Sequence, residues 1–292
     1  MKTIVIAEAG VNHNGKLHIA KKMVDHAKRA GADYIKFQSF DSNEIVTESA
    51  KKAEYQLEKN DKETQYQMLK KLEINKQFLN QIVKYSKKKK IKFLSTAFDE
   101  KSLKLLEKYK LDYIKIPSGE ITNYPLLKQI SMLKKKVLLS TGMASLSEIR
   151  QALKVFRKKK DITILHCTSD YPANLKDLNL NFIKKLKKFG CEVGYSDHSS
   201  SIITPSIAVS LGCKVVEKHF TLSKNLKGPD HKASLEPQEL KRMISLIRDT
   251  EKMLGSNNKI ITKSEQKTKL LVRKSLVAKN DIKKRLFHKG IM

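Results

Sequence analysis

Eight short apolar runs of β-strand type alternate with amphipathic helical stretches, and this alternation restricts the fold more than any other feature of the chain. Strands that alternate with helices pair in parallel, and eight such units close an α/β fold of the TIM (β/α)8 barrel type. An open doubly wound sheet usually has fewer strands and a glycine-rich phosphate turn, which Gly10–Gly15 does not provide. We expect strands at residues 3–10, 34–40, 92–98, 113–120, 137–143, 162–169, 192–199 and 215–222.

The remaining segments predict the domain organisation. The 292 residues divide into a barrel at residues 1–255 and a polar linker with a short apolar and basic segment at residues 256–292. Residues 41–73 follow the second strand, are rich in Lys, Glu and Gln, and predict a helical excursion over the barrel mouth. Ser145 and Glu148 have the spacing of a capping box, and Pro237 marks another helix start.

The composition predicts the cellular compartment of the protein and the classes of partner that it binds. The sequence contains neither a signal peptide nor a membrane-spanning apolar run, and its three cysteines fit a reducing compartment, so we expect a cytoplasmic protein without a membrane partner. The formal net charge of +30 raises the question of nucleic-acid binding. The excess is nearly all Lys and is spread over most helices, without a recognition motif, so we expect no nucleic-acid partner.

Polar side chains collect where the predicted strands end, which is the face where barrel enzymes place their active sites. A buried parallel strand should be nearly all apolar, so a charged residue within it is costly unless it is paired or binds a ligand. The residues concerned include Glu8, Lys36, Gln38, Thr96, Lys115, Ser118, Glu120, Ser140, Ser196, His198 and His219.

Two lysines stand out because they alternate with apolar neighbours. Lys36 and Lys115 therefore turn to one side of their strands, which we expect to be the barrel interior. Together with the nearby hydroxyl groups they favour a small ligand carrying phosphate and carboxylate groups. A structural ion network with Glu8 or Glu120 is the alternative.

Two histidines end neighbouring strands of the predicted barrel. His198 and His219 stand close enough to reach one metal ion and would leave coordination positions open, as in a catalytic site. The alternative is a pair of hydrogen-bonded core histidines. Glu217 or Asp197 could orient one imidazole, and Glu8 and Glu120 are candidates for acid or base chemistry.

Several motifs together resemble bacterial N-acetylneuraminate (sialic acid) synthases, in order from about Thr3 to Lys284. The motifs are Ala7-Glu8-Ala9-Gly10-Val11-Asn12-His13-Asn14-Gly15, Ile35-Lys36-Phe37-Gln38, Ile114-Lys115-Ile116-Pro117-Ser118-Gly119-Glu120, Leu139-Ser140-Thr141-Gly142-Met143, Ser196-Asp197-His198-Ser199, Glu217-Lys218-His219-Phe220-Thr221 and Gly228-Pro229-Asp230-His231-Lys232-Ala233-Ser234.

The resemblance implies a homodimeric transferase that condenses phosphoenolpyruvate with N-acetylmannosamine, with a diacetamido hexose of the legionaminate type as the alternative acceptor. It implies Mn²⁺ or Mg²⁺ at His198 and His219, which would polarise the acceptor aldehyde. Phosphoenolpyruvate would contact Lys36, Lys115, Thr96, Ser118, Ser140 and Ser196. Gln38 is a further substrate-binding candidate, and the sugar would meet Glu8, Glu120, Tyr171 and Asp230.

The resemblance also implies a small antifreeze-like domain after the barrel. Residues 273–284 begin that pattern and Arg285–Met292 departs from it, so residues 256–292 are expected to be a linker and a truncated antifreeze-like segment. A truncated, inactive barrel with a binding or regulatory role is therefore the alternative to an enzyme.

Overall fold

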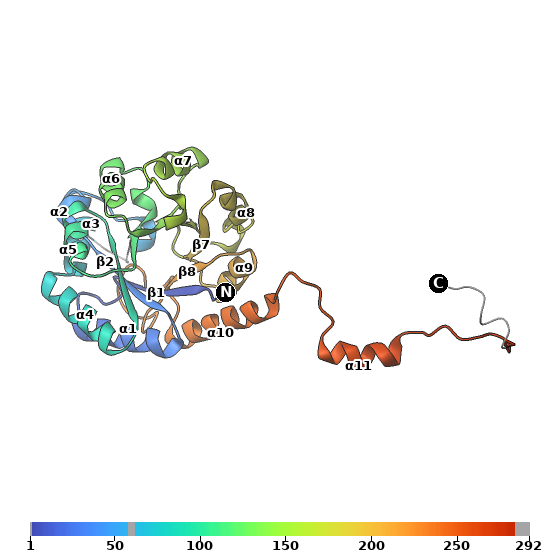
Figure 1. Cartoon of the computed structure of the whole chain (residues 1–292). Helices are drawn as coiled ribbons and strands as arrows, with labels where there is room; N and C mark the ends of the chain where they lie inside the picture. The colour runs from blue at the N-terminus through green and yellow to red at the C-terminus, as the bar shows by residue number, and fades with distance from the viewer. Residues whose placement is uncertain (1, 58–61, 284–292) are drawn as a thin grey trace. The chain divides into compact units, whose positions relative to one another are not determined.

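The computed structural model describes residues 2–57 and 62–283 of the chain. It contains two compact units, Met1–Leu254 and Gly255–Met292. The first is a closed parallel barrel whose strands follow one another in chain order, with helices around them (Figure 1). The prediction of an eight-stranded TIM barrel is confirmed. The strands are β1 Ile4–Gly10, β2 Tyr34–Ser39, β3 Lys92–Ala97, β4 Tyr113–Ile116, β5 Lys136–Ser140, β6 Ile162–Cys167, β7 Glu192–Asp197 and β8 Val215–His219.

Every strand except β1 ends earlier than predicted, and β4 shows why. It stops at Ile116 rather than Glu120 because Pro117 has no N–H to donate to a neighbouring strand. The next residues form the short 3-10 helix η2, Ser118–Glu120. Part of the polar sequence therefore lies on the loops above the barrel instead of on its strands.

The helices follow the expected amphipathic pattern, and their apolar sides pack on the outside of the sheet. Ser145 and Glu148 form the predicted capping box before α7, and α10 begins at Pro237. The α-helices are α1 Leu17–Ala30, α2 Ser42–Ile45, α3 Gln65–Leu72, α4 Lys76–Lys88, α5 Glu100–Glu107, α6 Tyr124–Met132, α7 Leu146–Lys154, α8 Phe182–Leu186, α9 Thr204–Ser210, α10 Pro237–Leu254 and α11 Lys263–Val272. The other 3-10 helices are η1 Glu54–Gln56, η3 Lys159–Asp161, η4 Leu175–Asp177 and η5 Lys187–Phe189.

The barrel interior is apolar at one end and polar at the other. A separate apolar cluster comes from the first halves of the strands and includes Ile6, Leu94 and Val215. Because side chains alternate along a strand, Glu8, Thr96 and Glu217 follow on the same inner face, two residues nearer the carboxyl ends. The apolar end closes the base of the barrel, and the polar end is its mouth.

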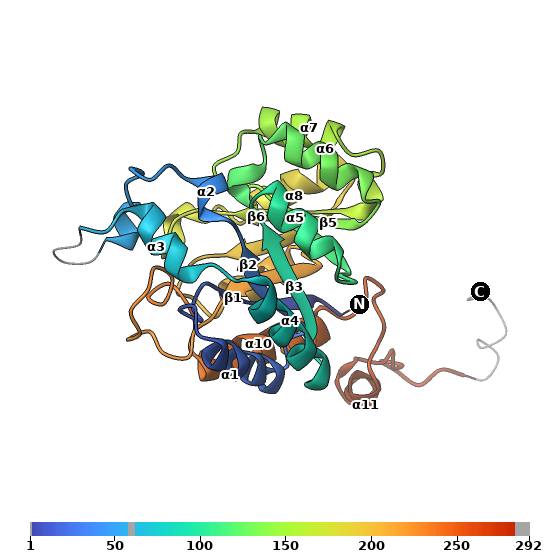
Figure 2. The same ribbon diagram turned by 90° about the vertical axis from the view of Figure 1, so that its left-hand side faces the viewer.

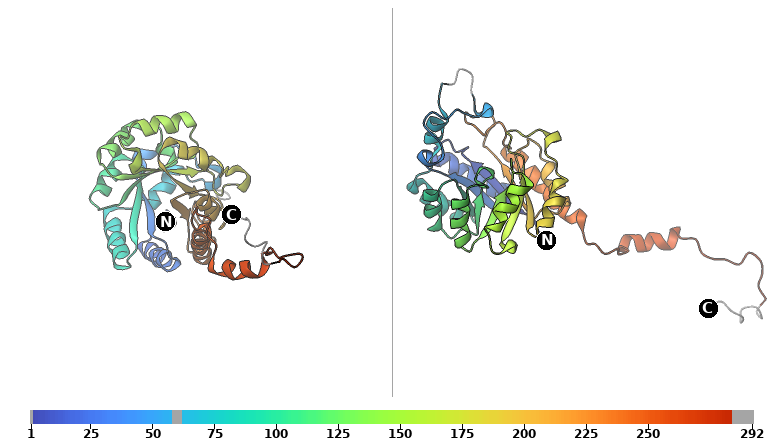
Figure 3. Two further views of the ribbon diagram at one scale, coloured as in Figure 1. Left: turned by 45° about the vertical axis from the view of Figure 1, so that its right-hand side comes forward. Right: turned by 90° about the horizontal axis from the view of Figure 1, so that it is seen from above.

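The segment after β2 lies over the mouth, as the sequence predicts. It contains α2, η1 and α3, and α2 lies beside α3 on the side of the barrel opposite the N-terminus (Figure 2). A view from above shows the same arrangement (Figure 3). The ring of Tyr55 in η1 stacks on Tyr171, which follows β6. This contact joins the segment to the rim of the mouth.

The unit Gly255–Met292 contains α11, which is capped by Thr262 and carries exposed apolar side chains such as Leu270 and Leu271. The predicted departure from an antifreeze-like pattern at Arg285–Met292 lies outside the described residues. None of the helices in residues 2–57 and 62–283 is both long and apolar enough to cross a membrane.

Candidate active site

The polar mouth brings together two carboxylates and two lysines that the strand alternation turns inward. Nζ of Lys36 lies 2.9 Å from Oε2 of Glu8 and 3.6 Å from Oε2 of Glu217. Nζ of Lys115 lies 3.6 Å from Oε1 of Glu217. All four side chains are at most 5% exposed. We call these four residues the lysine–glutamate cluster.

Hydroxyl groups supply further hydrogen bonds to this cluster. Lys36 donates to Oγ1 of Thr96 at 2.7 Å, and Lys115 donates to Oγ of Ser140 at 2.8 Å. Oγ of Ser196 donates to Glu217 at 3.0 Å. Three predicted substrate residues therefore contact the cluster directly.

Glu217 makes contacts that its sequence position does not reveal. It was one of two candidates for orienting an imidazole, and it lies between two lysines because period-two alternation places it on the inner face. The lysines therefore already have carboxylate partners in the protein. The structural network that we kept as an alternative exists with Glu8 but not with Glu120.

Burial and charge separate the two carboxylates of the cluster. Burial raises the pKa of Glu8 to about 7 although Lys36 opposes the shift. Burial acts on Glu217 in the same direction, but Lys115 and Lys36 outweigh it and lower its pKa to about 2. Glu217 is therefore the fixed anion, and Glu8 is the carboxyl that exchanges a proton near neutral pH. When Glu8 is protonated, the lysine–glutamate cluster has an excess positive charge.

The two predicted metal ligands lie side by side above the cluster. The imidazole centroids of His198 and His219 are 5.5 Å apart, and both side chains are buried. Nδ1 of His219 is buried without a hydrogen-bond partner in the described structure. Burial lowers the pKa of His219 well below its usual value, so this imidazole is neutral and its nitrogen can donate electrons to a metal.

The surroundings of the histidines fit a divalent ion with open coordination positions. Oδ2 of Asp230 lies 3.8 Å from Nδ1 of His219 and could supply oxygen. Among the described residues, no group of three or more His, Cys, Asp or Glu side chains is arranged as a complete metal site. Catalytic metal sites keep a coordination position open for water or substrate oxygen, and Asp230 would be a third protein ligand beside the two imidazoles. Gly10 leaves room here, because a Cβ on it would lie 3.3 Å from Cε1 of His219.

Tyr171 covers His198. Its ring stacks on the imidazole at a centroid distance of 4.2 Å, and its hydroxyl lies 3.1 Å from Nε2. Sequence analysis missed a second neighbour, Cys167, whose Sγ lies 3.6 Å from Nδ1 of His198. The signal for Cys167 was its inward position two residues after Leu165. It lies at the mouth rather than within the helix-packed core.

The other predicted residues lie at different places on the mouth. Gln38 donates to Oε1 of Glu8 at 3.3 Å, and Oγ of Ser118 accepts from the Gly142 N–H at 3.0 Å. Glu120 stands apart, because Oε2 accepts from Asn123 at 2.6 Å and makes no hydrogen bond or ion pair with the cluster in the described residues. The early end of β4 places Glu120 on η2, away from the strand face that holds Lys115.

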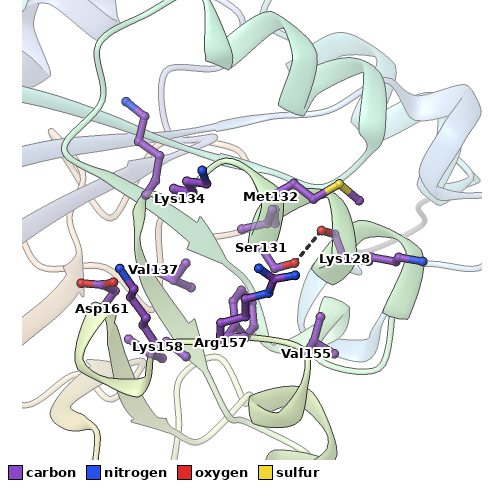
Figure 4. A pocket seen from close by; sticks show the side chains of 13 residues that line it. Lys128, Ser131, Met132, Lys134, Val137, Val155, Arg157, Lys158 and Asp161 are labelled. Atoms are coloured by element: carbon purple, nitrogen blue, oxygen red, sulfur yellow. Dashed lines mark hydrogen bonds between the residues drawn. The ribbon is translucent and has the colours of Figure 1, made fainter.

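The base of the barrel has a hollow of about 740 Å³ between the ends of α6 and α7 (Figure 4). Val137 and Ile162 at the starts of β5 and β6 help to line it. Lys128 and Lys158 extend toward opposite sides of the hollow (Figure 4). Its basic side chains do not converge as those of the mouth do, so the chemistry belongs to the mouth.

The comparisons with known proteins agree with the architecture of the mouth. Residues 23–259 match the model of the NeuB family. An N,N'-diacetyllegionaminic acid synthase of Campylobacter jejuni is 52% identical over 99% of this chain and 89% of its own length. Its counterpart in Legionella pneumophila is 42% identical over 97% of this chain and 82% of its own length.

A solved structure supports the same assignment. The crystal structure of the N-acetylneuraminic acid (sialic acid) synthetase of Leptospira borgpetersenii in complex with citrate superimposes with a TM-score of 0.81. The two sequences are 35% identical, and the match covers 93% of this chain and 91% of the other. The chain therefore belongs to the NeuB family of phosphoenolpyruvate-dependent sugar-acid synthases.

Proposed function

We propose that the protein condenses phosphoenolpyruvate with a diacetamido hexose to give a legionaminate-type sugar acid and phosphate. The observation that carries the reaction class is the lysine–glutamate cluster beneath His198 and His219. The acceptor is proposed from the 52% identity to the Campylobacter jejuni synthase over almost the whole chain.

The cluster is suited to an anion that carries both carboxylate and phosphate. Lys115 has hydroxyl and carbonyl partners and a carboxylate only at 3.6 Å, so its ammonium group can take a closer anionic oxygen. Lys36 is tied to Glu8, and protonation of Glu8 would release its charge for the ligand. We therefore assign phosphoenolpyruvate to Lys36, Lys115, Thr96, Ser140 and Ser196, with Ser118 at the edge.

The carboxyl groups have different tasks in this proposal. Glu8, with a pKa of about 7, can carry the proton that is exchanged with water or substrate near neutral pH. Glu217 stays ionised and holds the two ammonium groups in register. Glu120 would act through the sugar rather than through the cluster, because it lies on η2 and its carboxylate accepts from Asn123. Gln38, Tyr171 and Asp230 surround the space left for the sugar.

His198 and His219 would hold Mn²⁺ or Mg²⁺. When bound, such an ion supplies a Lewis acid for the acceptor aldehyde. Removing Nδ1 of His219 should remove the metal without unfolding the barrel. We expect His219→Ala to lose Mn²⁺ binding in calorimetry at unchanged far-UV circular dichroism, with His18→Ala on the exposed side of α1 as the control. Metal binding by His219→Ala equal to that of wild type would contradict this assignment.

The activity test uses the purified full chain with phosphoenolpyruvate, Mn²⁺ and a panel of N-acetylated hexoses. We expect phosphate release that depends on the sugar, with the highest kcat/KM for a diacetamido hexose. N-acetylmannosamine is the second candidate, favoured by the likeness to the Leptospira borgpetersenii sialic acid synthetase. Phosphoenolpyruvate binding without turnover of any sugar would support a binding or regulatory barrel instead.

A further inference from the structure

Three aromatic rings form a column from the loop segment over the mouth down to the metal site. The ring of Tyr55 stacks on Tyr171 at a centroid distance of 5.0 Å and an interplanar angle of 28°. Tyr171 stacks in turn on His198 at 4.2 Å and 27°. Tyr55 comes from η1, far in sequence from the other two rings, so the segment after β2 builds part of the wall of the mouth.

The hydroxyl group of Tyr55 donates no hydrogen bond within the described residues. Its only hydrogen bond in the described residues comes from Nε2 of Gln56 at 3.2 Å, and there the tyrosine oxygen accepts. The O–H proton is therefore available. Partial burial, with 38% of the residue still exposed, and then the charge of Asp230 raise the pKa of Tyr55, so this hydroxyl stays protonated.

A hydroxyl donor complements the carbonyl group of an amide. An acetamido group presents a C=O that accepts and an N–H that donates, whereas a sugar hydroxyl presents one oxygen for both tasks.

The position of Tyr55 decides which part of the sugar it meets. An aldehyde bound near His198 lies at the inner end of the column, and Tyr55 lies beyond Tyr171 at the outer end. The first acetamido group, next to the aldehyde carbon, stays near the inner end. A group farther along the carbon chain comes within range of Tyr55.

We propose that Tyr55 determines acceptor specificity by binding the second acetamido group of a diacetamido hexose. This inference rests on the proposed function and assigns the selectivity to one residue of the loop segment. Tyr55 is a substrate-contacting residue in this account, and it acts on binding rather than on the chemical step.

The test compares the acceptors in one panel of variants. Tyr55→Phe keeps the stacked ring and removes only the hydroxyl. We expect it to raise KM for the diacetamido hexose about 10-fold, the worth of one hydrogen bond, at unchanged kcat. The KM for N-acetylmannosamine should stay within about 2-fold because that sugar lacks the second amide.

Tyr66→Phe is the matched control, because it removes a hydroxyl group from the same segment. The Tyr66 hydroxyl donates to Asn43. It should leave the KM for both acceptors unchanged. An equal effect of Tyr55→Phe on both acceptors, or no effect on either, would overturn the inference alone. A wild type that prefers N-acetylmannosamine would overturn the inference and the proposed acceptor together, while the reaction class would stand. A wild type that releases no phosphate with any acceptor would overturn the proposed function and this inference with it.

Discussion

Two ion pairs with nearly the same geometry occupy opposite ends of the barrel. At the mouth end, Nζ of Lys218 lies 2.7 Å from Oδ2 of Asp197, and both side chains are 0% exposed. At the base, Nζ of Lys2 lies 2.8 Å from Oδ1 of Asp33, and the side chains are 63% and 24% exposed. Distance alone does not distinguish them, but their solvation does.

The difference shows how this chain uses charge. Water screens the pair at the base, so it contributes little to stability. At the mouth, a charge that loses its partner stays desolvated, so charges there must be matched by the fold or by a ligand. Asp197 also accepts from Tyr195, Ser199 and Thr204, and this network holds the carboxyl ends of β7 and β8, which carry His198 and His219, against each other.

The largest expected effect of a substitution is therefore at the mouth end. Lys218→Met should lower the free energy of unfolding by about 3 to 5 kcal/mol because Asp197 keeps its charge without its ammonium partner. Lys2→Met should cost less than about 1 kcal/mol, since Asp33 retains Arg248 and the Val5 N–H. Urea unfolding of both variants measures the difference. Equal losses would show that burial does not separate the two ends.

The second comparison concerns ligand binding. Lys115→Met should weaken phosphoenolpyruvate binding by about 2 to 5 kcal/mol, since it removes a desolvated ammonium group from the lysine–glutamate cluster. Lys158→Met at the base hollow is the matched control and should bind as wild type does. Titration calorimetry of both variants measures their affinity for phosphoenolpyruvate. An unchanged dissociation constant for Lys115→Met would show that Lys115 does not bind phosphoenolpyruvate.

Much of this contrast could be predicted from periodicity. Alternation along β2 and β4 placed Lys36 and Lys115 inside the barrel, and the order of the strands placed His198 beside His219. Such patterns are local in the sequence. Once the barrel closes, residues at the carboxyl ends of neighbouring strands lie close together. That these residues contact a ligand remains a prediction.

The side chains that contact one another in the mouth could not be predicted in the same way. Glu217 pairs with Lys36 and Lys115, which come from different strands, so its partners depend on strand tilt and register rather than on its neighbours in the chain. The stacking of Tyr55 on Tyr171 depends on the path of a loop segment that has no period. Glu120 was predicted to end the strand of residues 113–120, but Pro117 ended β4 before it.

A smaller effect should appear in the pH dependence of stability. The pKa of Glu8 rises from 4.5 to about 7 on folding, so the folded chain holds a proton that the unfolded chain has lost over this interval. Its contribution to stability is complete below pH 4.5 and disappears as the pH rises to about 7. Relative to Glu8→Gln, wild type should lose up to about 1.4 kcal/mol per pH unit in this window. Parallel profiles of the two proteins in urea unfolding would contradict the shift.

The smallest effect is expected at the base hollow and tests the other half of the comparison. Arg157 is exposed and makes no hydrogen bond or ion pair in the part of the chain that the structure describes. Its guanidinium is solvated, so Arg157→Ala should change the free energy of unfolding by no more than about 0.5 kcal/mol. Phosphoenolpyruvate affinity and turnover should also be unchanged, because no paired charge links the hollow to the mouth. A loss of affinity or activity in Arg157→Ala would mean that the base communicates with the active site, and the division of the barrel into a structural end and a chemical end would then be wrong.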